Sequence, residues 1–136
     1  MTKIKVLIVD DEPAMRTILG AIIGDMGYDV MEAGDAKSGF SVAMSQRPEL
    51  ILSDFMMPGE PGKTIFGELA SHSETKNIPI IVISGFSKEK IQSYLPQHLW
   101  PFIMGKPVDL LRLEGVIADC LKKKAESPGW FSSLFA

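Results

Sequence analysis

The sequence alternates five times between a short, mostly apolar run and a segment whose apolar residues have helical spacing. Short apolar runs of this kind are typical of strands buried on both faces of a sheet. The runs occupy residues 4–9, 28–33, 50–54, 78–83 and 102–104. The helical segments occupy residues 13–26, 35–47, 65–70, 88–95 and 109–124. This alternation predicts an α/β fold, a doubly wound (βα)5 parallel five-stranded sheet with helices on both faces.

Two of these elements are expected to differ from the others. The run at 28–33 is the least apolar, so we expect it nearer the edge of the sheet. The fourth helix is followed by the stretch 94–101, which contains two prolines and a tryptophan. Because proline interrupts a helix, we expect this helix to be short or distorted. Tyr94 and Trp100 then serve either as local packing or as a surface that contacts a partner, and His98 is interpreted as a surface residue.

Composition and charge limit the classes of function. A chain of 136 residues fits one domain, which we place at residues 1–124, with a linker and an apolar tail at 125–136. The net charge of −3 argues against DNA binding by this chain alone. No apolar run approaches the roughly 20 residues of a membrane-spanning helix, and no signal peptide is expected.

The single cysteine and the aromatic tail carry further expectations. Cys120 lies on the apolar side of the last predicted helix, so we expect a core residue. One cysteine cannot form an internal disulfide, which favours a cytoplasmic protein. For the tail, which begins Trp130-Phe131, three placements stay open besides disorder: docking on the domain, binding a partner, or touching a membrane surface.

Reactive polar residues stand where the predicted strands end. The first strand is followed by two acids, the third ends in one, and the fourth and fifth are followed by a hydroxyl and an ammonium; these residues are Asp10, Asp11, Asp54, Ser84 and Lys106. The carboxyl ends of parallel strands meet at one edge of a sheet, where ligands bind. Three carboxylates gathered there repel one another unless a cation is present, and all-oxygen ligation suits Mg²⁺. The set therefore predicts a site where Asp54 accepts a phosphoryl group.

The motifs that carry these residues resemble the receiver domain of two-component response regulators, in family order and at family spacing. They are Val9-Asp10-Asp11-Glu12, Ser53-Asp54-Phe55-Met56-Met57-Pro58-Gly59, Ile83-Ser84-Gly85 and Lys106-Pro107. The resemblance covers about residues 3–124 and is to single-domain, chemotaxis-regulator-like receivers. It implies a flavodoxin-like fold.

The resemblance also implies a role for each site residue. Asp54 would be the phosphoacceptor, and Asp10, Asp11, Asp54 and the backbone carbonyl of Met56 would hold Mg²⁺. Ser84 and Lys106 would contact the phosphoryl oxygens, and the Lys106–Pro107 bond would be cis. The phosphoryl donor would be a histidine kinase or a phosphotransfer protein, and a downstream protein partner would respond. Such a protein assists its own phosphorylation but is not an enzyme in the usual sense.

The sequence departs from the family at three positions. Met56 and Phe86 occupy positions that tune hydrolysis of the acyl phosphate, and both are apolar and unable to orient a water. We therefore expect slow self-dephosphorylation. Ile103 stands where the family often carries an aromatic residue, with Phe102 beside it, so the usual coupling between the hydroxyl and that aromatic is in doubt.

Two other functions remain as alternatives. The first is a Mg²⁺-dependent phosphohydrolase with Asp54 as nucleophile, although Met56 stands where such an enzyme places its general acid. The second is a pseudo-receiver, a binding module whose site is not phosphorylated.

Overall fold

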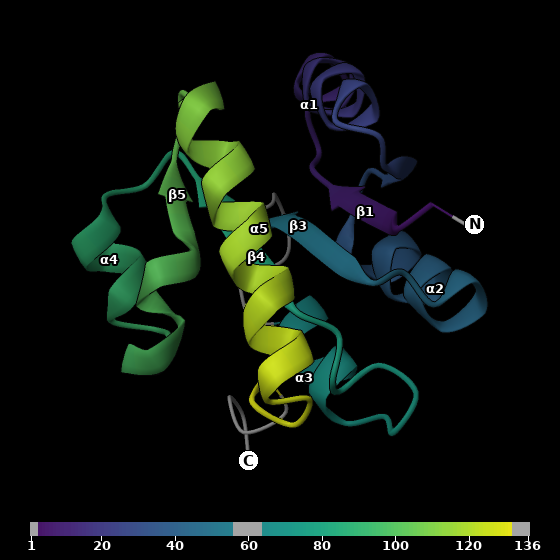
Figure 1. Ribbon diagram of the computed structural model, residues 1–136. Coiled ribbons are helices and arrows are strands. Elements are labelled where there is room, and N and C mark those ends of the chain that lie inside the picture. Colours follow the sequence, from purple (N-terminus) through teal and green to yellow (C-terminus); the bar gives the residue numbers. More distant parts are fainter. Residues whose placement is uncertain (1–2, 56–63, 132–136) are drawn as a thin grey trace.

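The sheet of the computed structural model, which describes residues 3–55 and 64–131, has five parallel strands (Figure 1). The strands are β1 (Lys5–Val9), β2 (Asp29–Ala33), β3 (Leu50–Asp54), β4 (Ile80–Ser84) and β5 (Ile103–Gly105). Their order is β2-β1-β3-β4-β5, so the predicted parallel α/β sheet is confirmed and the second strand lies at its edge. The chain runs outward in opposite directions from β1 and β3, which makes their carboxyl ends the topological switch point.

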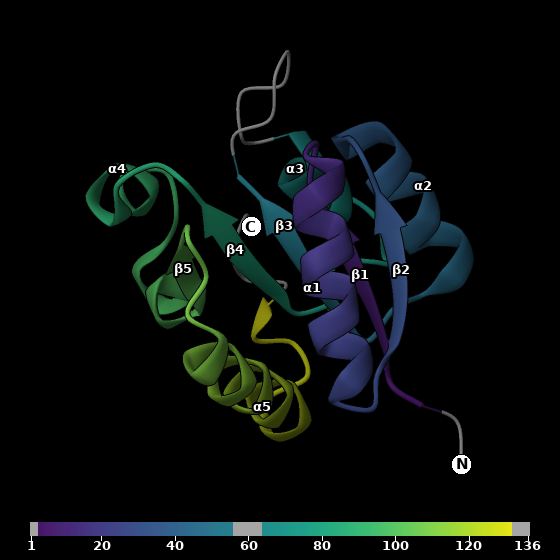
Figure 2. The same cartoon turned by 90° about the horizontal axis from the view of Figure 1, so that it is seen from above.

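Helices cover both faces of this sheet. They are α1 (Pro13–Asp25), α2 (Ala36–Gln46), α3 (Thr64–Ala70), α4 (Lys88–Gln92), α5 (Leu110–Glu126) and the 3₁₀ helix η1 (Gln97–Phe102). Helices α1 and α5 lie on one face, and α2, α3 and α4 lie on the other (Figure 2). No helix within residues 3–55 and 64–131 is long and apolar enough to cross a membrane.

The three central strands form the core, because helices cover them on both sides. Every residue of β3 and β4 is buried, as expected for inner strands of a doubly covered sheet. Helix α2 approaches β1 closely at Gly39, where an added Cβ would lie 3.0 Å from side-chain atoms of both Val9 and Ile65. A side chain at position 39 would therefore push α2 away from β1 and α3.

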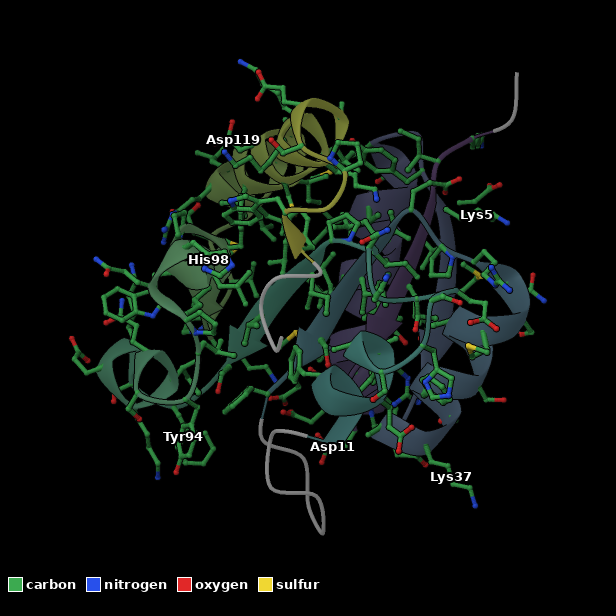
Figure 3. The ribbon with its side chains drawn as sticks, turned by 90° about the horizontal axis from the view of Figure 1, so that it is seen from below. Lys5, Asp11, Lys37, Tyr94, His98 and Asp119 are labelled. Carbon is green, nitrogen blue, oxygen red and sulfur yellow. The ribbon has the colours of Figure 1, made fainter. Side chains whose placement is uncertain are left out.

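The fourth helix has only five residues, which confirms the expected short helix. After it, the chain passes through a turn at Tyr94 and Leu95 and enters η1. Trp100 is half-buried, and its Nε1–H donates to the Leu95 carbonyl at 3.1 Å, so this tryptophan serves local packing. Tyr94 is 60% exposed and lies beside α4, with His98 on the neighbouring η1 (Figure 3).

The C-terminal helix extends two residues beyond its predicted end, to Glu126. Cys120 is fully buried on its inner side, as predicted, and burial raises the pKa of its thiol to about 12. Past the helix, Phe131 is only 2% exposed and Trp130 is half-buried. Of the three placements considered for the tail, these two residues show docking on the domain; residues 132–136 lie outside the described part of the chain.

Candidate functional site

Two neighbouring strands place one carboxylate each at the switch point of the sheet. Val9 of β1 pairs with Ser53 of β3, so the residues that follow them, Asp10 and Asp54, emerge side by side. Both are nearly inaccessible, with 2% and 6% of their surface exposed. Apolar strand residues precede each of them, and this rigid support holds the two carboxylates in place.

Two more acids join them from the loop between β1 and α1. One carboxylate oxygen from each of four residues, Asp10, Asp11, Glu12 and Asp54, lies within 4.8 Å of the others. Carboxylates this close repel one another, and a bound cation relieves that repulsion. The donors are all oxygens, as hard cations such as Mg²⁺ and Ca²⁺ prefer. The cluster could hold such an ion.

Lys106, just past the end of β5, supplies positive charge to this cluster. Its Nζ lies 2.9 Å from Asp10 Oδ2, 2.9 Å from Asp54 Oδ2 and 3.3 Å from Glu12 Oε1. Burial alone would lower the pKa of Lys106, but hydrogen bonds to Asp10 and Asp54 and the charges of these carboxylates outweigh burial and raise it. The ammonium is therefore charged throughout the physiological range. The Lys106–Pro107 bond is cis, as the resemblance implied.

Ser84 is the last residue of β4 and is buried. Because Asp54 pairs with Ile83, Ser84 lies one residue beyond it on the adjacent strand, at the same edge of the sheet. Its hydroxyl oxygen accepts a hydrogen bond from the Phe86 N–H at 3.1 Å, and its carbonyl accepts one from the Lys106 N–H at 2.9 Å. Ser84 thus ties the ends of β4 and β5 together.

Local hydrogen bonds fix the first acid. The Asp10 Oδ1 accepts from the Glu12 N–H at 2.9 Å, and the Asp10 N–H donates to the Ala33 carbonyl of β2 at 3.1 Å. Arg16, one turn into α1, donates from its guanidinium to the Asp10 carbonyl and pairs with Glu32 at 3.4 Å. These bonds orient the Asp10 carboxylate toward Lys106 and leave its Oδ2 for the ammonium.

The site contains two contributors to which the sequence assigned no role. Glu12 was visible only as the third acid of a run, and its contact with Lys106 depends on the turn into α1. Arg16 lies one helical turn after Pro13, a spacing that places it near the start of α1 but does not show which group it meets. Met56, the expected backbone ligand, lies outside the described residues.

Two departures from the family can be located. Phe86 is 41% exposed beside Ser84, and the Lys90 ammonium lies 4.6 Å from the centroid of its ring. Ile103 is buried in β5, so no aromatic side chain occupies the position where receivers often carry one. An aromatic contact exists elsewhere: the Tyr94 ring lies 5.6 Å from that of Phe55, the residue after Asp54.

The sequence matches one protein family and several curated proteins. The sequence pattern of the response regulator receiver domain matches residues 6–118. Protein PilH of Pseudomonas aeruginosa is 30% identical over 105 residues, which are 77% of this chain and 87% of PilH. The DNA-binding dual master transcriptional regulator RpaA of Synechocystis is 33% identical over 92 residues, 66% of this chain and 38% of RpaA. The chain spans between 35% and 38% of the first three curated relatives.

Solved structures give the same result for the fold. The chemotaxis response regulator CheY4 of Vibrio cholerae is similar with a TM-score of 0.76 and 27% identity, covering 88% of this chain and 99% of that chain. A response regulator from Desulfuromonas acetoxidans gives a TM-score of 0.75 and 26% identity, covering 88% and 97%. The receiver-domain pattern over residues 6–118 includes the strand ends that carry the four acids, the serine and the lysine.

Proposed function

Because the chain belongs to the response regulator receiver family, we propose that Asp54 receives a phosphoryl group from a histidine kinase or a phosphotransfer protein and that the domain then acts on a protein partner. Receiver domains are signalling phosphoacceptors and are generally not classed as enzymes. The observation that carries the proposal is the Lys106 ammonium, 2.9 Å from Asp54 Oδ2 and 2.9 Å from Asp10 Oδ2. Lys106 thus pairs with the proposed phosphoacceptor and with a second acid of the cluster at the same time.

Each residue has a role that follows from its place. A carboxylate oxygen of Asp54 attacks the phosphorus of the donor, and the bond from phosphorus to the donor nitrogen breaks. Lys106 lies 2.9 Å from Asp54 Oδ2 and would offset the negative charge that the phosphoryl group brings. Ser84, on the adjacent strand, offers a hydroxyl that can donate to a phosphoryl oxygen.

The acids Asp10 and Asp11 would hold Mg²⁺ together with Asp54, and Glu12 borders the same cluster. The donor set fits this ion because it is all oxygen and carries excess negative charge. When bound, Mg²⁺ neutralises charge on the phosphoryl oxygens. The acids would position the ion, while Lys106, which contacts Asp10, Glu12 and Asp54, and Ser84 would act on the phosphoryl oxygens.

We propose further that the phosphorylated form is long-lived. Phe86, two residues after Ser84, offers an aromatic ring and no group that could orient an attacking water. The Phe86 N–H donates to the Ser84 hydroxyl at 3.1 Å, which holds the backbone of Phe86 beside Ser84. We expect the half-life of the acyl phosphate, in Mg²⁺ and without a phosphatase, to be far longer than a minute. The half-life is measured from the rate at which phosphoprotein disappears on a Phos-tag gel.

The test of the proposed function is intact-mass spectrometry after incubation with acetyl phosphate and Mg²⁺. We expect the mass to rise by one phosphoryl group in the wild-type protein and not in Asp54→Asn. An unchanged wild-type mass would favour the pseudo-receiver and reject the proposal. Steady turnover of a phosphate monoester that Asp54→Asn abolishes would instead identify a phosphohydrolase.

A further inference from the structure

The last described residues of the chain pack where β4 and β5 begin, at the end of the sheet opposite the acids. Phe131 borders a cavity of about 10 Å³ together with Phe66 and Leu69 of α3 and Ile80 of β4. Its ring centroid lies 5.8 Å from that of Phe102, the last residue of η1. Because the cavity is so small, Phe131 is closely packed and anchors the end of the chain in the core.

Trp130 connects this anchor to η1 and to α5. Its ring lies 4.8 Å from His98 and 5.6 Å from Phe102, both in edge-to-face geometry. On its other side, the Lys123 ammonium lies 5.2 Å from the centroid of the ring. We call residues 127–131 the C-terminal clasp, because they join η1 to the end of α5. Trp130 is half-buried, so it is more exposed to solvent than Phe131.

The segment held by the clasp reaches back to the phosphoacceptor strand. Trp100 of η1 donates its indole N–H to the carbonyl of Leu95, in the turn after α4. The neighbouring Tyr94 places its ring 5.6 Å from that of Phe55, which directly follows Asp54. The ring contacts of Trp130 with η1, the hydrogen bond of Trp100 to Leu95 and the contact of Tyr94 with Phe55 are thus joined through the backbone of η1 and of the turn after α4.

The start of α4 is connected to the site independently of that route. The Ser84 hydroxyl accepts from the Phe86 N–H, and Ser87 caps α4 by accepting from the Lys90 N–H at 3.2 Å. If Ser84 turned its hydroxyl toward a phosphoryl group, the Phe86 N–H would lose its acceptor and the loop would have to adjust. Helix α4 is short, so only about two helical turns separate Ser87 from Tyr94. A shift of the backbone at Ser87 would therefore also move the turn at Tyr94.

We propose that the C-terminal clasp is an autoinhibitory contact. Trp130, packed on η1, favours the arrangement in which Asp54 is paired with Lys106. Phosphorylation of Asp54 loosens the contact of Trp130 with η1, while Phe131 stays anchored. The proposal rests on the proposed function. Thermodynamic linkage makes this coupling reciprocal. Loss of the Trp130 contact therefore raises the equilibrium constant for occupying the phosphoryl site by the same factor by which phosphorylation weakens the contact.

The reciprocal effect is measured with Trp130→Ala, which leaves the Phe131 anchor in place. We expect about fivefold or more tighter binding of beryllofluoride, an inert mimic of the phosphoryl group, in Mg²⁺. The matched control is Leu111→Ala, which shortens an apolar side chain that is 91% exposed on α5 and has no place in the clasp. Equal affinities in Trp130→Ala and the wild type would overturn the proposal.

The forward effect is measured in the wild-type chain. The two tryptophans are replaced by 5-fluorotryptophan, and the ¹⁹F signal of Trp130 is assigned with Trp130→Phe. After acetyl phosphate and Mg²⁺, we expect the solvent isotope shift of that signal to increase, and no change in Asp54→Asn. Intact mass is recorded on the same samples. A phosphorylated protein with an unchanged Trp130 signal rejects the clasp and leaves the proposed function standing, whereas an unphosphorylated wild type rejects both.

Discussion

The two ends of the sheet carry different kinds of side chain, charged at one end and aromatic at the other. At the carboxyl end, Asp10 and Asp54 are buried beside Lys106, and four carboxylates share one small volume. At the amino end of β4 and β5, aromatic rings meet: Phe131 is buried against Phe102. Among residues 3–55 and 64–131, the cluster of acids paired with Lys106 lies at the carboxyl end, and the proposed chemistry is therefore placed there.

The contrast teaches how one small domain divides its tasks. Like charges gathered together oppose folding unless other groups offset their repulsion. The carboxylates at the acid end therefore lower the free energy of unfolding while they supply the reactive groups. Burying large aromatic side chains favours folding strongly and needs no charged partner. The aromatic end should therefore support the stability on which the acid end depends, and the two ends should respond differently to substitution.

The largest effect is expected at the aromatic end. Phe131→Ala removes a buried ring from close packing and should lower the free energy of unfolding by about 3–5 kcal/mol. Urea unfolding followed by circular dichroism measures this loss. The control Leu111→Ala should stay within about 0.5 kcal/mol of the wild type, because its side chain is exposed. A loss below about 1 kcal/mol in Phe131→Ala would show that the ring adds little to the core.

The next effect belongs to the acid end. Lys106→Met removes the ammonium that contacts Asp54 and should slow phosphorylation by acetyl phosphate about 100-fold, as expected for the loss of one charge-stabilising donor. Intact mass followed over time gives the rate. Lys37→Met, which removes an exposed lysine from α2, serves as the control and should react at the wild-type rate. Equal rates in both variants would remove Lys106 from the proposed chemistry.

The smallest effect concerns Cys120, a titratable group that lies in the core and away from the acid end. Its pKa rises from 9.0 to about 12 on folding, so the thiol ionises first in the unfolded chain. The neutral thiol favours the folded state fully below pH 9. This stabilisation is lost as the pH rises from 9 toward 12, because the thiol of the unfolded chain ionises in that range. Between pH 8 and pH 10 the wild type should lose about 1.4 kcal/mol more than Cys120→Ala. Parallel pH profiles of the two proteins in urea unfolding would contradict this expectation.

The acid end could be predicted from the sequence because its residues occupy positions that topology alone brings together. Asp10 and Lys106 each follow a strand, Asp54 is the last residue of one, and parallel strands end at one edge. Cys120 could be placed because helical spacing marks the buried side of α5. In both cases a local pattern determines a three-dimensional position.

The aromatic end could not be predicted in the same way. Nothing within a few residues of Phe131 shows that it contacts Phe102 or lines a cavity with Phe66, because this placement depends on how the chain turns after α5. The contact of Tyr94 with Phe55 likewise depends on where the short α4 releases the chain. Packing between segments far apart in sequence leaves no periodic pattern, so the sequence left the tail with three placements.

The burial of Phe131 also decides where the protein can be cut or joined to something else. The family pattern ends at residue 118, so a fragment trimmed to that boundary would lose a core aromatic residue together with the end of α5. A bulky tag attached close behind Phe131 would compete with the packing against η1. Labels for imaging or purification are better placed at the other terminus, where the exposed Lys3 and Ile4 lead into β1.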